Sequence, residues 1–253
     1  MKPSPELECA LEAAEAAARV IRELYAKNLS VRLKHDKTPV TDADVRAEQA
    51  IRAVIERRFP GHAFHGEETG SSGSGDALWL VDPIDGTKAF VREYPMFSTQ
   101  IAFMREGRLQ LGVSSAPLYG ELAHAERGEG AWLNGRRLSV STTATLEAAA
   151  LSSGNLKTLA AGPGWARYGA LVARLGRIRG YGDFLHYHLL SAGKIDAVLE
   201  SDVNILDIAA LVTIVEEAGG RFTTLAGGAI DVHSTSVLAS NGTLHAALLT
   251  ALA

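Results

Sequence analysis

The sequence of 253 residues contains a single cysteine, Cys9. A disulfide within the chain and a metal site built from several thiolates are therefore excluded. No apolar run approaches the roughly 18 residues that a membrane-spanning helix needs. The first residues, MKPSPELECALEAAE, also lack the apolar stretch of a signal peptide, so we expect a cytoplasmic protein without a membrane partner.

The sequence also has no strong excess of positive or of negative charge. The formal net charge is −4, from 25 basic and 29 acidic residues. Because the sequence shows no basic patch, we expect no binding to nucleic acid or to an anionic membrane surface. A site for an anionic substrate would need a local source of positive potential, such as metal ions or helix N-termini.

The residues that are present suffice for a sizeable core, since 47% of them are hydrophobic. The apolar periodicity predicts a helix over 5–26, with Ser4 as N-cap, and a second helix after TPVTDAD. Short alternating segments predict antiparallel strands at 78–81, 98–104, 109–114 and 121–125. Asn134–Gly135 is typical of a hairpin turn.

From about residue 145 the pattern changes to alternating helices and strands. Strands are predicted at 148–152 and 197–200, and helices at 164–175, 183–193, 207–218 and 242–252. We therefore predict an α+β half, residues 1–143, and an α/β half, residues 144–253, with a boundary near 140–147.

The stretch LWLVDPIDGTKAFV places two carboxylates at the end of an apolar strand. If the chain turns sharply at Pro83, Asp82 and Asp85 point into the same space, with the Ile84 carbonyl between them. Hard divalent ions such as Mg²⁺ prefer oxygen ligands of this kind. The same letters are favoured in a type I turn, so this stretch alone leaves a plain turn and a metal site equally open.

The residues that follow this pair favour the binding of an anion. If GTKAF opens a helix, the amides of Gly86 and Thr87 point outward with the helix dipole behind them. Such amides can donate hydrogen bonds to the oxygens of a phosphate group.

Further acidic residues stand at other element boundaries. Glu67 and Glu68, in GEETG, carry adjacent carboxylates that repel each other unless a cation lies between them. Asp44 and Asp207 lie at the starts of two predicted helices. Capping can explain each of the two by itself, although Thr41 could cap the first helix without Asp44. Four acidic loops at four boundaries are less easily explained as four independent caps.

In combination, these motifs resemble the inositol monophosphatase family. The resemblance rests on GEE, on DPIDGT about fifteen residues later, and on an aspartate that opens a helix containing AA. It extends from DKTPVTDAD to LDIAALVTIVEEAGG. It implies a Mg²⁺-dependent phosphomonoesterase, a layered αβαβα sandwich and a homodimer.

The resemblance also implies a role for each residue of the site. The first metal ion would be held by Glu67, Asp82 and the carbonyl of Ile84, and the second by Asp82, Asp85 and Asp207. A third, more weakly bound ion would also be coordinated by Glu67, so two or three Mg²⁺ ions are expected. The catalytic residues would be Thr87, Asp44 and Glu67, with Thr87 and Asp44 orienting and deprotonating the attacking water. Substrate contacts would come from Asp85, Gly86, Thr87, Asp183, Glu200 and Asp207, and Lys34 would lie near the water network.

Other segments resemble the histidinol-phosphatase branch of the family. After DGT the chain reads KAF, where inositol phosphatases usually carry Thr-Asn-Phe, and GDFLHYHLLSAGKIDAVLE is also similar to that branch. Asp183 stands where inositol enzymes tend to have a small residue, and Glu200 at a position that usually touches substrate. Two carboxylates suit the ammonium and imidazole groups of histidinol phosphate better than neutral hydroxyls. We therefore predict histidinol phosphate, of histidine biosynthesis, as substrate.

Several alternatives stay open at this point. Asp183 can simply cap the next helix, and His186 and His188 are expected to be packed or surface residues. Leu206 replaces the usual aromatic residue before Asp207, which puts the packing there in question. The substrate could instead be inositol 1-phosphate, a broad range of phosphomonoesters or a nucleoside 3′,5′-bisphosphate, with Arg92 as contact for the second phosphate. A non-catalytic metal-binding or phosphate-binding regulator is the remaining alternative.

A final expectation concerns the Gly/Ser-rich segment 70–76, which follows Glu67 and Glu68 directly. Its composition predicts a flexible loop with no core potential. We expect it to be a mobile lid or edge of the site when no metal is bound.

Overall fold

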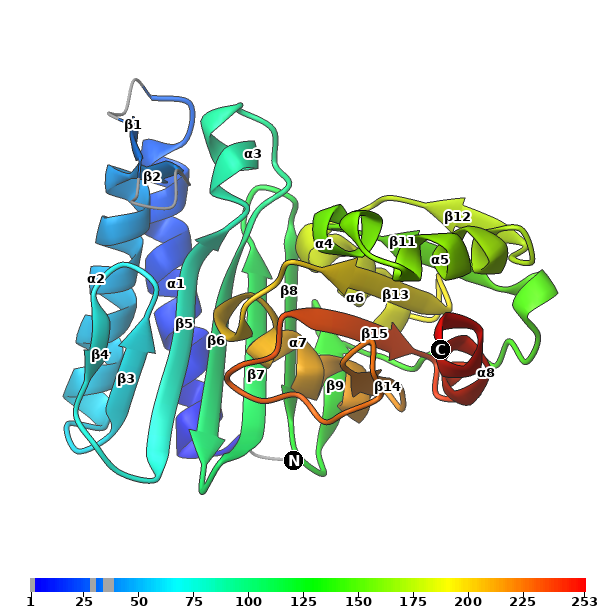
Figure 1. The fold of residues 1–253 in the computed structure, drawn as a ribbon. Helices are drawn as coiled ribbons and strands as arrows, with labels where there is room; N and C mark the ends of the chain where they lie inside the picture. The colour runs from blue at the N-terminus through cyan, green and yellow to red at the C-terminus, as the bar shows by residue number, and fades with distance from the viewer. Residues whose placement is uncertain (1–2, 28–30, 34–38) are drawn as a thin grey trace.

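The structure, a computed structural model, describes residues 3–27, 31–33 and 39–253. Five layers follow one another across the molecule (Figure 1). The first layer holds helices α1 (Pro5–Leu24) and α2 (Asp42–Arg58), and the second is an eight-stranded sheet. Helices α6 (Asp183–Ser191) and α7 (Ile205–Glu217) form the third layer, and a five-stranded sheet forms the fourth. The outer layer holds α4 (Lys157–Ala161), α5 (Gly164–Val172) and α8 (His245–Leu252). The predicted αβαβα sandwich is confirmed.

The eight-stranded sheet has the order β10-β9-β8-β7-β6-β5-β3-β4. Its strands are β3 (Ala63–Gly66), β4 (Gly70–Ser72), β5 (Ala77–Asp85), β6 (Ser98–Arg105), β7 (Arg108–Ala116), β8 (Glu121–Glu126), β9 (Gly130–Leu133) and β10 (Arg136–Arg137). All neighbours pair antiparallel except β3 and β5, which are parallel. The short helix α3 (Thr87–Val91) follows β5, and β1 (Val31–Leu33) pairs with β2 (Pro39–Thr41) outside this sheet.

The five-stranded sheet has the order β12-β11-β13-β15-β14. Its strands are β11 (Ala150–Ser153), β12 (Arg177–Arg179), β13 (Ala197–Ser201), β14 (Arg221–Thr223) and β15 (Ser236–Ser240), and the 3₁₀ turn Leu146–Ala148 precedes β11. Strand β11 is parallel to both its neighbours, whereas β15 is antiparallel to β13 and β14. None of the helices in the described part of the chain is long and apolar enough to cross a membrane.

Local sequence signals account for the ends of several elements. The Ser4 hydroxyl accepts a hydrogen bond from the Leu7 amide at 3.0 Å, which confirms the predicted N-cap of α1. The predicted hairpin joins β9 to β10, and Asn134 and Gly135 have φ angles of +49° and +75°. Both central residues of a type I′ turn need positive φ, which Asn-Gly adopts easily.

Helix α7 connects the two halves of the chain. It belongs to the second half by sequence but packs against β5, β6, β7, β8 and β9 of the first sheet. Its buried residues form one cluster with Leu80 of the eight-stranded sheet and Val198 of the five-stranded sheet. The predicted boundary near 140–147 therefore lies between two sheets that share one core.

Gly112, on β7, sets how closely α7 approaches the first sheet. A Cβ atom at this position would lie 2.1 Å from the Ala210 carbonyl oxygen. Backbone contact of this kind leaves no room for a side chain.

Replacing Gly112 by alanine is expected to lower the free energy of unfolding by about 1–3 kcal/mol, the usual cost of overpacking a core. Urea denaturation of the variant measures this change. Gly61→Ala is the matched control, because a Cβ at Gly61 meets no atom within 4 Å. An equal stability of the two variants would contradict the close contact between β7 and α7.

The segment 70–76 differs from the expected flexible lid. Residues 70–72 form the edge strand β4, in which Ser72 pairs with Phe64 of β3. The Arg52 guanidinium also donates a hydrogen bond to the Ser72 hydroxyl at 2.7 Å. Composition alone missed this strand, because its pairing depends on contacts distant in the sequence.

Candidate active site

The stretch DPID does not turn. Strand β5 continues to Asp85, and its register against β6 shifts between Asp82 and Asp85, as in a β-bulge. Pro83 lies in this irregular part of β5, where its lack of an amide N–H costs no regular hydrogen bond between the strands. Both the predicted sharp turn at Pro83 and the alternative type I turn are therefore wrong, since the side chains are aimed by a bulge.

Three carboxylates meet at this bulge. Asp82 and Asp85 come from β5, Asp207 comes from the first turn of α7, and one oxygen of each lies within 4.8 Å of the others. Asp82 is held by a hydrogen bond of 2.9 Å from the Ile84 amide. Asp207 accepts hydrogen bonds from the Asn204 amide at 2.9 Å and from its side-chain nitrogen at 2.7 Å.

The electrostatics of this cluster favour a bound cation. Burial raises the pKa of Asp82 and of Asp85 well above the usual value, and repulsion by neighbouring carboxylates adds to it. Burial also raises the pKa of Asp207 to about 7, with further repulsion from Glu67 and against the hydrogen bonds from Asn204. The donor atoms are hard carboxylate oxygens, so these residues fit Mg²⁺.

The carboxylates open into a cavity of about 490 Å³. Its lining includes most of the residues that the sequence singled out, namely Glu67, Asp82, Ile84, Asp85, Gly86, Thr87, Asp183 and Asp207. It also includes Lys88, Arg92, Asn155 and Asp202. None of the residues 70–76 lines it, so the structure does not place that segment as a lid. Lys34 lies outside the described residues.

Asp44 lies directly behind the cavity wall. It is fully buried, and its Oδ1 accepts a hydrogen bond of 3.0 Å from the Thr87 hydroxyl, which is also 3.0 Å from the Ile84 carbonyl oxygen. Its Oδ2 accepts bonds from the Thr41 amide at 2.7 Å and hydroxyl at 2.6 Å. Asp44 thus completes the capping box of α2 and holds Thr87 with the same carboxylate.

Gly86 allows α3 to begin beside the bulge. Its φ is +93°, and a Cβ atom there would lie 2.7 Å from the Met96 carbonyl oxygen. The first amides of a helix have no partner within the helix, so the amides that start α3 are available to a bound anion. Because α3 has only five residues, these amides matter more than the helix dipole.

Asp183, on α6, also lines the cavity. It is the first residue of α6 and has a φ of +46°, and the N-cap position before it is held by Gly182. The simple capping role is therefore wrong. Burial, with repulsion from Glu200, raises the pKa of Asp183 to about 6, against the opposing electrostatic effects of His186 and Lys88.

Glu200 lies behind the cavity wall and is not among its lining residues. Its Oε2 accepts hydrogen bonds from the Tyr187 hydroxyl at 2.6 Å and lies 3.1 Å from His186 Nε2. Burial alone would raise the pKa of Glu200, but the charge and hydrogen bonds of these neighbours outweigh it and lower the pKa. Direct contact between Glu200 and substrate is therefore not supported by this arrangement. Gly154 leaves the room that Glu200 occupies, since a Cβ there would lie 1.7 Å from Oε1.

The two histidines of α6 are both buried. His186 pairs with Glu200, and His188 Nδ1 lies 2.7 Å from Glu121 on β8. They face different partners, as their spacing of two residues along a helix predicts.

Leu206 does not disturb the position of Asp207. Its side chain is buried in the core shared by the two sheets. Its amide donates a hydrogen bond of 2.8 Å to the Asn204 side-chain oxygen, which completes a capping box with Asp207. Cap geometry, rather than an aromatic neighbour, thus orients this carboxylate.

Sequence reasoning missed two residues that support the site. Asn204 was visible as the first letter of NILD, a capping-box pattern three residues before Asp207. Glu48 follows Asp44 by one helical turn and is an acidic residue on the buried face of α2. A charge on a predicted apolar stripe is the signal that could have found it.

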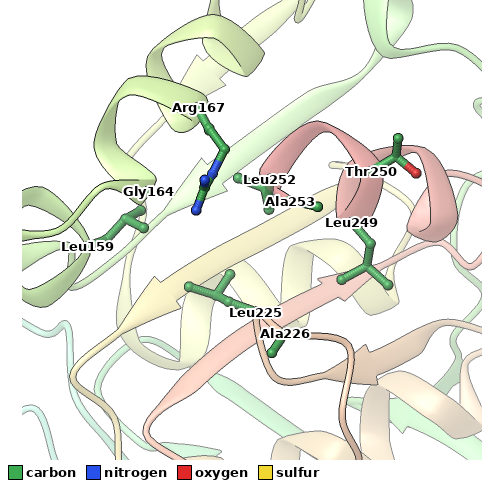
Figure 2. A pocket seen from close by; sticks show the side chains of 9 residues that line it. All are labelled: Leu159, Gly164, Arg167, Leu225, Ala226, Leu249, Thr250, Leu252 and Ala253. Carbon is green, nitrogen blue, oxygen red and sulfur yellow. The ribbon is translucent and has the colours of Figure 1, made fainter.

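A second cavity differs in character. It has a volume of about 560 Å³ and lies between α5 and α8, and Figure 2 shows the Arg167 side chain extending into it. The other residues that line it, among those the structure describes, are uncharged side chains such as Leu159, Leu225 and Leu249. It brings no group of acids or bases together, whereas the acidic cavity holds the cluster of three carboxylates and is the candidate active site.

Several known proteins are similar to this chain in sequence and in fold. The sequence profile of the inositol monophosphatase family matches residues 2–253. A histidinol-phosphatase from Mycobacterium tuberculosis is 41% identical, over 98% of this chain and 97% of that protein. A fructose-1,6-bisphosphatase/inositol-1-monophosphatase from Thermotoga maritima is 36% identical, over 83% and 80%. The crystal structure of the extragenic suppressor protein suhB from Bartonella henselae superposes with a TM-score of 0.91, at 31% identity over 98% of both chains.

Proposed function

The chain belongs to the inositol monophosphatase family and is a phosphoric monoester hydrolase, and we propose that it uses Mg²⁺ to hydrolyse histidinol phosphate to histidinol and phosphate. The observation that carries the metal-dependent part is the cluster of Asp82, Asp85 and Asp207 at the bulge of β5. The observation that carries the substrate is the presence of Asp183 in the lining of the same cavity.

The proposed ligands follow from the donor atoms around the cluster. One ion would be held by Glu67, Asp82 and the Ile84 carbonyl, and another by Asp82, Asp85 and Asp207. A third, more weakly bound ion would also be coordinated by Glu67. When bound, the ions lower the pKa of water and stabilise negative charge on the phosphoryl and leaving oxygens. The chain's own part is to hold the ligands in place, through Ile84 for Asp82 and Asn204 for Asp207.

Thr87 and Asp44 are proposed to handle the proton of the attacking water. The Thr87 hydroxyl donates to Asp44, so a water that donates to Thr87 Oγ1 can lose its proton while Thr87 passes its own to Asp44. Burial raises the pKa of Asp44, although the hydrogen bonds from Thr41 and Thr87 oppose this. A carboxylate with a raised pKa is a stronger base than an exposed aspartate.

The phosphate is proposed to lie against the start of α3. The amides of Gly86 and Thr87 would donate hydrogen bonds to its oxygens, and the cationic side chains of Lys88 and Arg92 line the same cavity.

The Asp183 carboxylate in the cavity lining suits a cationic alcohol. Asp183 lies in a partly desolvated position, where a carboxylate–ammonium contact is worth more than a neutral hydrogen bond. Histidinol phosphate carries an ammonium group, whereas inositol carries only hydroxyls. The name of the relative from Mycobacterium tuberculosis supports the same substrate.

A substrate panel tests this proposal. With Mg²⁺, kcat/KM is expected to be higher for histidinol phosphate than for inositol 1-phosphate. Asp183→Ala should lower kcat/KM for histidinol phosphate about 10-fold or more, the effect of losing one charge-assisted hydrogen bond, and change it little for inositol 1-phosphate. Phosphate release measures both rates, and Asp183→Asn, which keeps the size of the side chain, is the matched variant. A higher rate for inositol 1-phosphate in the wild type would move the assignment to a general inositol phosphatase.

One observation favours a second candidate, a bisphosphate. Lys88 and Arg92 both line the cavity and could bind a second phosphate group. The relative from Thermotoga maritima is named for a bisphosphate as well as for inositol phosphate. Adenosine 3′,5′-bisphosphate and fructose 1,6-bisphosphate therefore belong in the same panel. A homodimer and a cytoplasmic location stay predictions from the sequence.

A further inference from the structure

A carboxylate outside the cavity lies beneath the loop that carries Glu67. Glu48, on α2, is 0% exposed. Its Oε2 accepts a hydrogen bond from the Glu68 amide at 2.8 Å, and its Oε1 accepts bonds from the Thr69 amide at 2.8 Å and hydroxyl at 2.5 Å. One buried side chain thus binds the two residues that follow Glu67.

The backbone on the other side of Glu67 is fitted to the same carboxylate. A Cβ atom at Gly66 would lie 2.5 Å from Glu48 Cδ and 2.6 Å from each of its oxygens. Only glycine lets the carboxyl group approach the chain this closely. Glu67 is therefore held between a residue that packs on Glu48 and two that donate hydrogen bonds to it.

Helix α2 connects this contact to the rest of the site. Asp44, Glu48 and Arg52 follow one another at intervals of four residues and so lie on one face of the helix. Asp44 accepts the bond from Thr87, whereas the Arg52 guanidinium donates to the Thr69 hydroxyl at 2.6 Å. The Thr69 hydroxyl thereby links the charges of Glu48 and Arg52, which reduces the cost of burying the carboxylate.

We propose that Glu48 is a positioning residue for metal binding. It holds the loop 66–69 so that Glu67 already faces Asp82 before an ion arrives. Partners that orient a ligand in this way typically raise metal affinity 10–100-fold. The inference rests on the proposed role of Glu67 as a metal ligand and adds the residue that presents this ligand.

The test is the affinity of the metal-free protein for Mg²⁺ alone, measured by isothermal titration calorimetry. Glu48→Gln keeps the size of the side chain but removes its charge and presents an NH₂ group to the amides of Glu68 and Thr69. The Kd for Mg²⁺ is expected to rise 10–100-fold. The rate of phosphate release at saturating Mg²⁺ should change much less, because Glu48 does not touch the cavity. A purely structural role would instead lower the melting temperature and leave the Kd of the folded protein unchanged.

Glu56→Gln is the matched control. Glu56 lies two turns further along α2 with its side chain 60% exposed, and like Glu48 it is four residues from Arg52. Its Kd should equal that of the wild type. Thr69→Val is a milder second variant, which removes one of the three hydrogen bonds and should raise the Kd several-fold even if Glu48→Gln folds poorly.

Glu67→Gln separates the two proposals. If it weakens Mg²⁺ binding while both Glu48→Gln and Thr69→Val bind like the wild type, the positioning role of Glu48 is overturned and the metal site stands. If Glu67→Gln itself binds Mg²⁺ like the wild type, the role of Glu67 is wrong and the inference about Glu48 fails with it. Parallel losses in Glu67→Gln, Glu48→Gln and Thr69→Val support both.

Discussion

Replacing Asp85 by asparagine is expected to abolish Mg²⁺-dependent phosphate release. Asp85 belongs to the group of three carboxylates within 4.8 Å of one another, and the amide of asparagine carries no charge to offset a divalent ion. A lost metal ion costs several kcal/mol of transition-state stabilisation, which corresponds to roughly 10³-fold in rate or more. Phosphate release from the best substrate of the panel, with and without Mg²⁺, measures the loss.

The fold of this variant should survive. Burial and neighbouring carboxylates raise the pKa of Asp85, so the metal-free folded state binds more protons than the unfolded chain. Its stability therefore falls as pH rises through this range, and removing the carboxylate removes that loss. At neutral pH the metal-free variant should melt at the wild-type temperature or above it.

The control for Asp85→Asn is Asp76→Asn, which removes an exposed carboxylate just before the same strand. It should leave both the rate and the melting temperature unchanged. Wild-type activity in Asp85→Asn would show that Asp85 is not a metal ligand. Inactivity with a collapsed melting curve would point to misfolding, and Asp207→Asn, in which the carboxylate comes from a different element, would then decide the question.

Replacing Thr87 by valine is expected to lower kcat about 10²–10⁴-fold, the usual contribution of general acid–base catalysis. Valine has the shape of threonine but cannot accept a proton from water or pass one to Asp44. Thr87→Ser retains the hydroxyl and should keep most of the activity. The Kd for Mg²⁺ should change little in either variant, which separates proton handling from metal binding.

The pH profile adds a second readout for the same pair. Asp44 must be ionised to act as a base, so the wild-type rate should rise with pH through the pKa of Asp44. Because burial raises this pKa, the rise should occur above the range of an exposed aspartate. Thr87→Val should lose this limb of the profile. Equal rates and equal profiles in Thr87→Val and Thr87→Ser would contradict the proposed proton path.

Local patterns in the sequence predicted much of this molecule correctly. The helix over 5–26, the Ser4 cap and the Asn134–Gly135 hairpin all rest on neighbours a few residues apart. Strand β15 was missed, and its five residues pair with β13 from more than thirty positions away. Pairing of this kind leaves no short-range signal beyond a few apolar residues.

In the candidate site, too, local motifs found some of the residues, whereas other contacts depend on the fold. Motifs in the sequence singled out Asp82, Asp85 and Thr87, and they lie together because one strand and the turn after it carry them. The residues that contact substrate were harder to predict, because the sequence does not show that the Glu200 carboxylate has partners. In the fold, His186 and Tyr187 bind it behind the cavity wall, whereas Asp183 is among the acids that line the cavity.

The sequence by itself singled out the acidic residues through motifs at short, characteristic spacings. These motifs carried the resemblance to the family, and the resemblance implied the layered fold. The tertiary structure alone decided how DPIDGT works. A bulge paired to β6 aims Asp82 and Asp85, α7 brings Asp207 to them from more than a hundred residues away, and Glu48 holds the loop of Glu67 from beneath. These contacts depend on packing between distant segments, which the order of residues encodes but no local pattern displays.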